Sequence, residues 1–166
     1  MLKIEILKKT VFTVYLVLGA VSDARRKSVP LWWVITGLVM AVVFAAGSHM
    51  AGRTDNAVSA DTGWGSPILG AATAFPFAAL SLAGGKWFGR ADGFVMLSIG
   101  LITGPLAAAG IFAIAFTAAA VFGTAASKIG PEHDPEAVSD NVSGNMIPFI
   151  PFLTAGWIVE MVLINV

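Results

Sequence analysis

Long apolar blocks separated by short polar stretches are the feature that most constrains what this chain can fold into. A membrane-spanning helix needs about 20 mostly apolar residues, because each residue adds about 1.5 Å along the helix axis. Only 12% of the 166 residues are charged, about half the share typical of soluble domains. We therefore expect an all-α, polytopic membrane protein that forms a single membrane-embedded domain over residues 1–166.

One of these blocks, Phe94–Ala126, is too long for a single crossing, since it would form a helix of about 50 Å. The dipeptide Gly104-Pro105 is a strong helix breaker and divides the block in two. The first half is short, so the fourth segment is expected to be a short or partial crossing. Six transmembrane helices are thus predicted, at Thr10–Val21, Val29–Gly47, Ser66–Ala83, Asp92–Thr103, Pro105–Ala126 and Ile147–Ile164.

The number of crossings places the polar segments Asp23–Ser28, Gly84–Arg90 and Ser127–Asn145 on one face of the membrane. Six lysines and arginines fall on that face and four on the other. This excess predicts that the face with six is the cytoplasmic face of a plasma membrane. Three N-terminal lysines argue against this orientation. A cleaved signal peptide ending near Ser22 is an alternative, but Glu5 is unusual there and further apolar blocks follow.

Composition also excludes several classes of chemistry. The chain contains no cysteine, which excludes disulfides, thiolate catalysis and cysteine-ligated zinc. Its formal net charge of +0 indicates no nucleic-acid partner. His49 and His133 lie in polar stretches and are expected to be solvated, so no apolar block holds a histidine base for a serine mechanism. We predict no metal and no cofactor.

Three of the ten acidic residues lie at or within apolar blocks, where ionisable groups are costly and often functional. Asp23 follows the first block, at a helix C-terminus that disfavours a carboxylate; the alternative is a solvated residue paired with Arg25 or Arg26. Asp92 begins a helix, where the alternative is an N-cap. Glu160 lies in the last block and is expected to snorkel or to pair locally.

Both Asp23 and Asp92 lie at helix ends on the same predicted membrane face. Two carboxyls brought close together cannot both ionise easily, so one keeps a proton while the other acts as a base on water. Such a pair can hydrolyse a peptide bond without a nucleophile, metal or cofactor. We predict that the two side chains converge and that no arginine forms a tight ion pair with either.

Three motifs resemble those of the type IV prepilin peptidase family, and they occur in the family's order. Asp23–Pro30 resembles the family pattern Asp-x-Arg-x-x-x-Ile-Pro. Gly89–Asp92 resembles its Gly-x-Gly-Asp motif, with Ala91 in place of the second glycine. Ile147–Leu153 resembles its Ile-Pro-Phe-Gly-Pro-Phe-Leu segment.

The resemblance implies a six-helix intramembrane aspartic peptidase of the short, peptidase-only form. Such enzymes cleave the basic leader of prepilin-like or preflagellin-like precursors at the cytoplasmic membrane face, and the precursor and membrane lipid are the expected partners. Asp23 and Asp92 are the implied catalytic residues, with no cofactor. The implied substrate-binding or site-shaping residues are Gly89, Ala91, Pro30, Pro148 and Pro151.

Departures from the family pattern at Leu31, Ala91 and Phe94 leave the substrate and the activity open. One alternative function is a proton-coupled transporter, which would place an acid such as Glu160 near the membrane midplane. Another is an inactive homologue that acts as a membrane assembly factor. Proline damages helix interiors, so Ile147–Pro151 is predicted to be a non-helical or kinked lead-in to the last helix.

Overall fold

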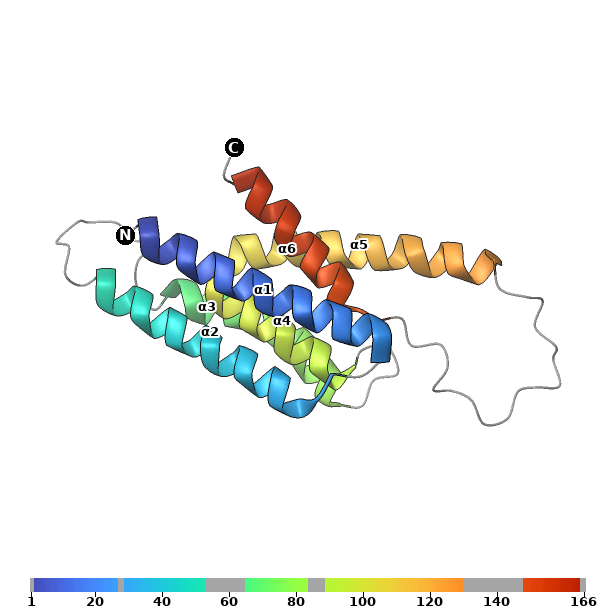
Figure 1. The fold of residues 1–166 in the computed structure, drawn as a ribbon, viewed down its shortest axis with the longest axis horizontal. Helices are drawn as coiled ribbons and strands as arrows, with labels where there is room; N and C mark the ends of the chain where they lie inside the picture. The colour runs from blue at the N-terminus through green and yellow to red at the C-terminus, as the bar shows by residue number, and fades with distance from the viewer. Residues whose placement is uncertain (1, 27–28, 53–64, 84–88, 130–147, 165–166) are drawn as a thin grey trace.

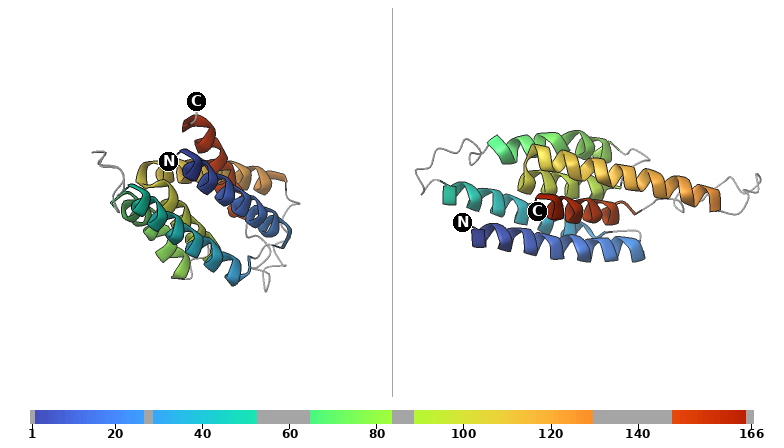
Figure 2. Two further views of the ribbon diagram at one scale, coloured as in Figure 1. Left: turned by 60° about the vertical axis from the view of Figure 1, so that its left-hand side comes forward. Right: turned by 90° about the horizontal axis from the view of Figure 1, so that it is seen from above.

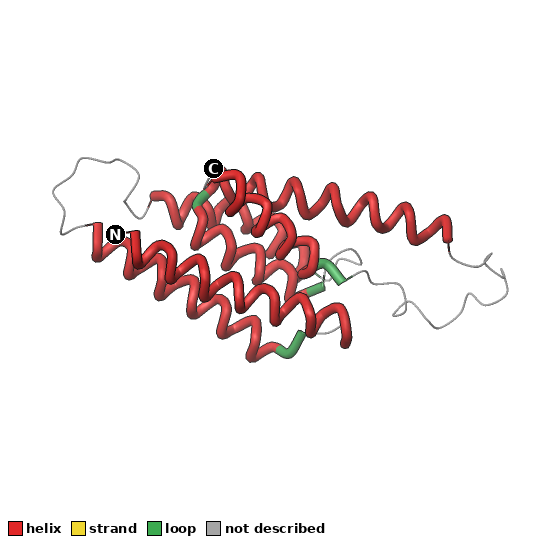
Figure 3. The backbone as a smooth tube through the Cα atoms, turned by 45° about the horizontal axis from the view of Figure 1, so that its top comes forward, coloured by secondary structure: helices red, strands yellow, loops and turns green. Residues whose placement is uncertain are grey.

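The computed structural model describes residues 2–26, 29–52, 65–83, 89–129 and 148–164, and these residues form helices and short connections without a strand. Figure 3 shows this all-helical backbone. The predicted all-α class is confirmed for the described chain. The helices are α1 (Leu2–Arg26), α2 (Leu31–Gly52), α3 (Gly65–Leu82), α4 (Arg90–Thr103), α5 (Pro105–Ile129) and α6 (Ile150–Ile164).

The predicted break at Gly104-Pro105 is confirmed, and its cause is local. Gly104 adopts a φ of 80° and a ψ of 178°, a conformation that favours glycine and that ends α4. Its N–H still donates to the Gly100 carbonyl at 3.0 Å, while its own carbonyl accepts the N–H of Ala108 at 3.1 Å. Pro105 then begins α5 at a position where no N–H is needed. The chain therefore reverses sharply, and α4 remains short at 14 residues.

The helices alternate in direction, so their ends collect at two opposite ends of the bundle (Figure 1). One end holds the last turn of α1, the start of α4, the last turn of α5 and the start of α6. The other holds the start of α1 and the junction between α4 and α5. This alternation brings Asp23 and Asp92 to the same end of the bundle.

Helix α4 lies in the interior of the bundle and packs against α2, α3 and α5 (Figure 2). Its contact with α3 is very close: a Cβ on Gly100 would overlap the backbone of Gly70, and one on Gly93 would overlap Ser81. Small residues allow helix backbones to approach in this way. Asp92 therefore belongs to a rigid, enclosed element.

The outer surface of the bundle is apolar, which is the reverse of a soluble protein. Large apolar side chains are exposed on five helices, including Leu31 at 69% and Leu106 at 87%, whereas among the described residues none belongs to α4. Two helices are long and apolar enough to cross a membrane, over Leu31–Ser48 and Pro105–Ala125. These observations are those of a membrane protein in which α4 is the enclosed helix.

The helix bounds differ from the predicted blocks mainly in length. α1 continues through Asp23 to Arg26, and α2 continues to Gly52. The first residues of the two polar segments predicted to be loops are therefore helical. The physical reason is that an apolar block measures the part of a helix suited to lipid, whereas backbone hydrogen bonding continues into polar residues. The acidic segment Glu132–Asp140 and both histidine side chains lie outside the described residues.

Candidate active site

Asp23 is positioned by the antiparallel packing of α1 against α6. The Trp157 indole N–H donates to Thr13 Oγ1 at 2.8 Å, and the Thr154 hydroxyl donates to the Leu16 carbonyl at 3.3 Å. The same seam ends where the backbone N–H of Ile150 donates to Asp23 Oδ2 at 3.3 Å. Asp23 is only 7% exposed. The two helices thus hold this carboxyl against the start of α6.

The start of α6 explains why a backbone donor is free at this point. Pro148 and Phe149 precede the helix, and the Phe149 carbonyl accepts the first helical hydrogen bonds, from Phe152 at 3.0 Å and Leu153 at 3.2 Å. The first N–H groups of a helix have no partner within it. Ile150 directs its N–H to Asp23, and Pro151 follows in the first turn, where its missing N–H costs nothing.

The predicted non-helical lead-in to the last helix is confirmed for Pro148 and Phe149, while Ile147 lies outside the described residues. Pro151 is helical, but it occupies the first turn rather than an interior position. The interpretation of Asp23 from the helix dipole of α1 was incomplete. The unfavourable C-terminal end of α1 is offset by the N-terminal end of α6, which attracts negative charge.

Asp92 is held by a reciprocal contact at the start of α4. The Gly89 N–H donates to Asp92 Oδ2 at 3.0 Å, and the Asp92 N–H donates to the Gly89 carbonyl at 3.1 Å. Asp92 is therefore not the N-cap, which is Gly89, but the third residue of the first turn. A Cβ added at Gly89 would lie 3.1 Å from Asp92 Oδ2, so a larger residue would crowd the carboxyl.

The two carboxyls influence each other electrostatically. Both lie in the end turns of their helices, at the same end of the bundle. Burial first, and then the negative charge on Asp23, raise the pKa of Asp92 to about 7, against the lowering effect of the Gly89 hydrogen bond. Burial also raises the pKa of Asp23, against the lowering effect of the Ile150 N–H. The site thus contains one acid that keeps its proton near neutral pH beside a second carboxyl.

The two arginines near the site whose side chains the structure describes do not neutralise it. Arg25 and Arg90 are both exposed. In the described part of the chain, neither of them forms an ion pair with either aspartate. The Arg26 side chain lies outside the described residues. An arginine bound to either carboxyl would hold it ionised and lower its pKa. The geometry leaves a shared proton possible.

The other predicted site residues lie around the two helix starts. Ala91 is half-buried in the first turn of α4, next to Asp92. Pro30 is exposed immediately before α2, and its carbonyl accepts the Trp33 N–H at 3.0 Å. Glu160 lies elsewhere, near the opposite end of the bundle in a cavity also lined by Lys9 and Thr103.

Sequence reasoning missed the Ile150 N–H as a partner of Asp23. A backbone donor has no residue-type signature, and only the two prolines flanking Phe149 and Ile150 marked this segment as a place where a helix starts. It also missed Ser81, a buried residue of α3 that packs against Gly93. Gly93 follows Asp92 in the sequence. The paired small residues of α3 and α4 were the available signal.

A carboxylic acid beside a carboxylate can perform acid and base catalysis on a bound water in one step. Burial strengthens this arrangement, because charges interact more strongly where water is excluded. Such a site favours hydrolysis of a polar bond presented at the end of the bundle.

Comparison with known proteins gives an independent result. No curated protein and no solved structure matches the chain. The sequence profile of the type IV leader peptidase family matches residues 10–124, which include both aspartates and most of the 166-residue chain. The Ile150 segment lies outside the matched range. The chain belongs to the type IV leader peptidase family, and this membership indicates a peptidase.

Proposed function

We propose that the protein is a membrane aspartic endopeptidase that removes the basic leader from a prepilin-like or preflagellin-like precursor. The observation that carries the proposal is the location of Asp23 and Asp92 at the same end of the bundle, where both are buried and the charge on Asp23 raises the pKa of Asp92. Membership of the leader peptidase family supports the same class of reaction.

In this proposal Asp92 holds the shared proton and Asp23 is the base. The Ile150 N–H stabilises a negative charge on Asp23, whereas Asp92 is the carboxyl whose pKa reaches about 7. Asp23 takes a proton from a water molecule, whose oxygen attacks the peptide carbonyl. Asp92 donates its proton to the carbonyl oxygen, which gives a tetrahedral gem-diol. Asp23 then passes the proton taken from water to the leaving nitrogen, the C–N bond breaks, and a gem-diol hydroxyl returns a proton to Asp92.

The proposed substrate is anchored in the membrane by its own apolar segment and presents its leader at the cytoplasmic face. A basic leader would be repelled by the Arg25–Lys27 segment, whose expected role is to set orientation. The acidic segment Glu132–Asp140 is the better docking surface because its charge is complementary. In the sequence this segment precedes α6, whose first residue, Ile150, contacts Asp23.

The experiment that tests this function is cleavage of a purified precursor by the full chain in detergent, read as a mobility shift on a gel. We expect the leader to be removed by the native chain and not by Asp23→Asn or Asp92→Asn. An inserted, folded native chain that leaves every tested precursor intact would instead support the inactive assembly factor. Cleavage that survives either asparagine substitution would exclude this aspartic mechanism.

We further propose that all six helices cross the membrane, with the aspartate end facing the cytoplasm. The chain has no cysteine, so single cysteines give a clean background. Ser28→Cys and Ser139→Cys should resist a membrane-impermeant thiol reagent in intact cells, while Ser59→Cys should react. Labelling at position 139 but not at position 28 would show that α4 and α5 are not two crossings.

A further inference from the structure

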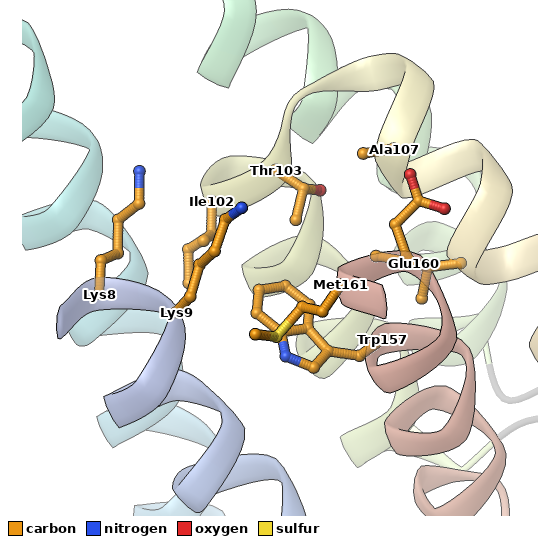
Figure 4. A pocket seen from close by; sticks show the side chains of 9 residues that line it. Lys8, Lys9, Ile102, Thr103, Ala107, Trp157, Glu160 and Met161 are labelled. Atoms are coloured by element: carbon orange, nitrogen blue, oxygen red, sulfur yellow. The ribbon is translucent and has the colours of Figure 1, made fainter. Parts of the chain in front are cut away.

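A cavity of about 250 Å³ lies at the end of the bundle opposite the two aspartates. Four helices contribute to it, with Lys9 from α1, Thr103 from α4, Ala107 from α5 and Glu160 from α6 (Figure 4). Lys9 lies 14 residues before Asp23 on the same helix, which corresponds to about 21 Å. The cavity is therefore separate from the proposed active site.

The cavity presents opposite charges that do not neutralise each other. Figure 4 shows the Lys9 ammonium directed toward Thr103, and the Glu160 carboxylate turned toward Ala107 on the other side. Within the described residues neither group has a hydrogen bond or an ion pair. The Glu160 carboxylate lies close to α5, because a Cβ on Gly110 would be 3.2 Å from its Oε2. The space between the two charges is open.

Membrane depth makes these unpaired charges costly. A hydrocarbon core is about 30 Å thick, whereas the cavity lies only about 21 Å along α1 from Asp23. If the aspartates lie at one membrane face, Lys9 and Glu160 lie at or below the headgroups of the other. Unpaired charges at that depth need partners. A ligand carrying both a negative and a positive group would satisfy both.

The remaining lining is apolar and aromatic. Ile102, Ile111, Trp157 and Met161 form it, and the Trp157 ring is buried against α1. Lysine and tryptophan are typical of the level where lipid headgroups meet hydrocarbon. The volume is below the range of about 300–1,000 Å³ for drug-sized ligands, so the space suits a small headgroup rather than a peptide segment.

We propose that this cavity binds the zwitterionic headgroup of a membrane phospholipid that carries a primary ammonium, such as phosphatidylethanolamine. The phosphate pairs with the Lys9 ammonium, and the lipid ammonium donates hydrogen bonds to the Glu160 carboxylate. Lys8 also lines the cavity, but its ammonium donates to Ser48 Oγ at 3.3 Å and it holds the wall in place. The proposal rests on the membrane placement given above and not on the catalytic mechanism.

The chemistry predicts selectivity among headgroups. Phosphatidylglycerol has the phosphate but no ammonium, and Glu160 would repel it. Phosphatidylcholine has both charges, but its methylated nitrogen has no N–H to donate to the carboxylate. A charge-assisted hydrogen bond contributes about 1.5–3 kcal/mol, so each lost contact should lower retention roughly tenfold or more.

The test is native mass spectrometry of the purified full chain, released from detergent after equilibration with these three phospholipids at equal concentration and acyl-chain length. We expect the native chain to retain phosphatidylethanolamine in preference to the others. Glu160→Gln should lower that retention about tenfold and abolish the preference over phosphatidylglycerol, and Lys9→Gln should lower the retention of both. Arg90→Gln, which removes a positive charge at the opposite end, serves as the control and should leave lipid retention unchanged.

Two results with the phospholipids would overturn the proposal. One is equal retention of the three lipids by the native chain, and the other is a preference for phosphatidylethanolamine that survives Glu160→Gln. Soluble phosphoethanolamine separates a lipid from a free metabolite as the source of the headgroup. If it displaces the lipid at equimolar concentration, the site belongs to the soluble compound and the lipid assignment is wrong. Because Lys9→Gln and Glu160→Gln lie on different helices, misfolding of one variant still leaves the other as a test.

Discussion

The two ends of the bundle treat charge in different ways. At the aspartate end, each carboxyl is buried and accepts a backbone N–H from the start of a helix: Ile150 for Asp23 and Gly89 for Asp92. At the cavity end, Lys9 and Glu160 line an open space and have no partner among the described residues. At one end the acids are therefore fixed by backbone donors, and at the other the charges line a cavity.

The difference teaches how a small membrane protein can hold charge for different purposes. Backbone donors fix a carboxyl in one orientation without neutralising it, which suits proton transfer. Side-chain charges facing a cavity are satisfied only by something that enters it. The following predictions test whether the aspartate end is the fixed, proton-sharing end that this comparison requires.

The largest effect is expected from removing either acid. Asp23→Asn and Asp92→Asn should each lower precursor cleavage at least about 10³-fold, because an amide keeps the shape but cannot accept or donate the proton. The double variant should be no worse than either single variant, since the pair acts as a unit. Gel-based cleavage in detergent is the measurement.

A matched control for this loss makes the same chemical change elsewhere. Asp61→Asn replaces an aspartate in the segment that joins α2 and α3. This segment is distant in sequence from the starts of α4 and α6, which supply the backbone donors to Asp92 and Asp23. It should cleave at close to the native rate. If it were as defective as the other two, loss of activity would report a general effect of charge rather than the pair.

The next effect concerns pH. Asp92 must keep its proton, so cleavage should fall about tenfold per pH unit once the pH rises above its pKa of about 7. Cleavage should also fall in acid, as the pH drops through the pKa of Asp23 and that base becomes protonated. The pair titrates together, so the two limbs belong to the dyad as a whole. Initial rates across a pH series provide the measurement, and a rate still rising above pH 9 would contradict the assignment.

How far the fold could be predicted depends on which property sets each boundary. Blocks of apolar residues located all six helices, and Gly104-Pro105 located the break because glycine and proline act locally on the backbone. The helix ends were less predictable. Arg26 and Gly52 close α1 and α2 beyond the apolar blocks, since hydrogen bonding and packing between helices decide where a helix stops.

The aspartates were predictable as site candidates because carboxyls at the edge of apolar blocks are rare and costly. Their hydrogen-bond partners were not. Ile150 contacts Asp23 through its backbone and across a long stretch of chain, so its side-chain type carries no information about the contact. The cavity combines Lys9, Thr103 and Glu160 from distant helices, and only their shared position at the same end of alternating helices could have suggested it.

A third, smaller effect concerns stability. Burial raises the pKa of Asp92 in the folded chain, so the contribution of this residue to the free energy of unfolding depends on pH. That contribution is fully present below the ordinary pKa of 3.8 and is lost as the pH rises through about 7. The shift corresponds to at most about 4 kcal/mol. Asp92→Asn should therefore be more stable than the native chain at pH 8 and similar to it at pH 4.

Thermal unfolding in detergent at the two pH values measures this difference, with the native chain scanned beside the variant. The asparagine oxygen still accepts the Gly89 N–H, so the hydrogen bond is retained and only the ionisation is removed. Equal stability of the two proteins at pH 8 would mean that Asp92 is not held in a site that disfavours its charge.

The smallest effect tests the rigidity that keeps Asp92 in place. A Cβ at Gly93 would overlap Ser81 and approach the Ala78 Cα to 2.8 Å, where α3 and α4 are in close contact. Gly93→Ala should destabilise the protein by about 1–3 kcal/mol through overpacking. Gly47→Ala is the matched control, because a Cβ there meets nothing within 4 Å. It should be neutral or stabilise α2 by up to about 1 kcal/mol, since alanine favours a helix more than glycine does. Denaturation of both variants under the same conditions compares them directly.

Because Gly93 adjoins Asp92, its substitution should also reduce cleavage, whereas Gly47→Ala should not. Equal stability and equal cleavage in the two variants would show that the contact between α3 and α4 does not hold Asp92 in position.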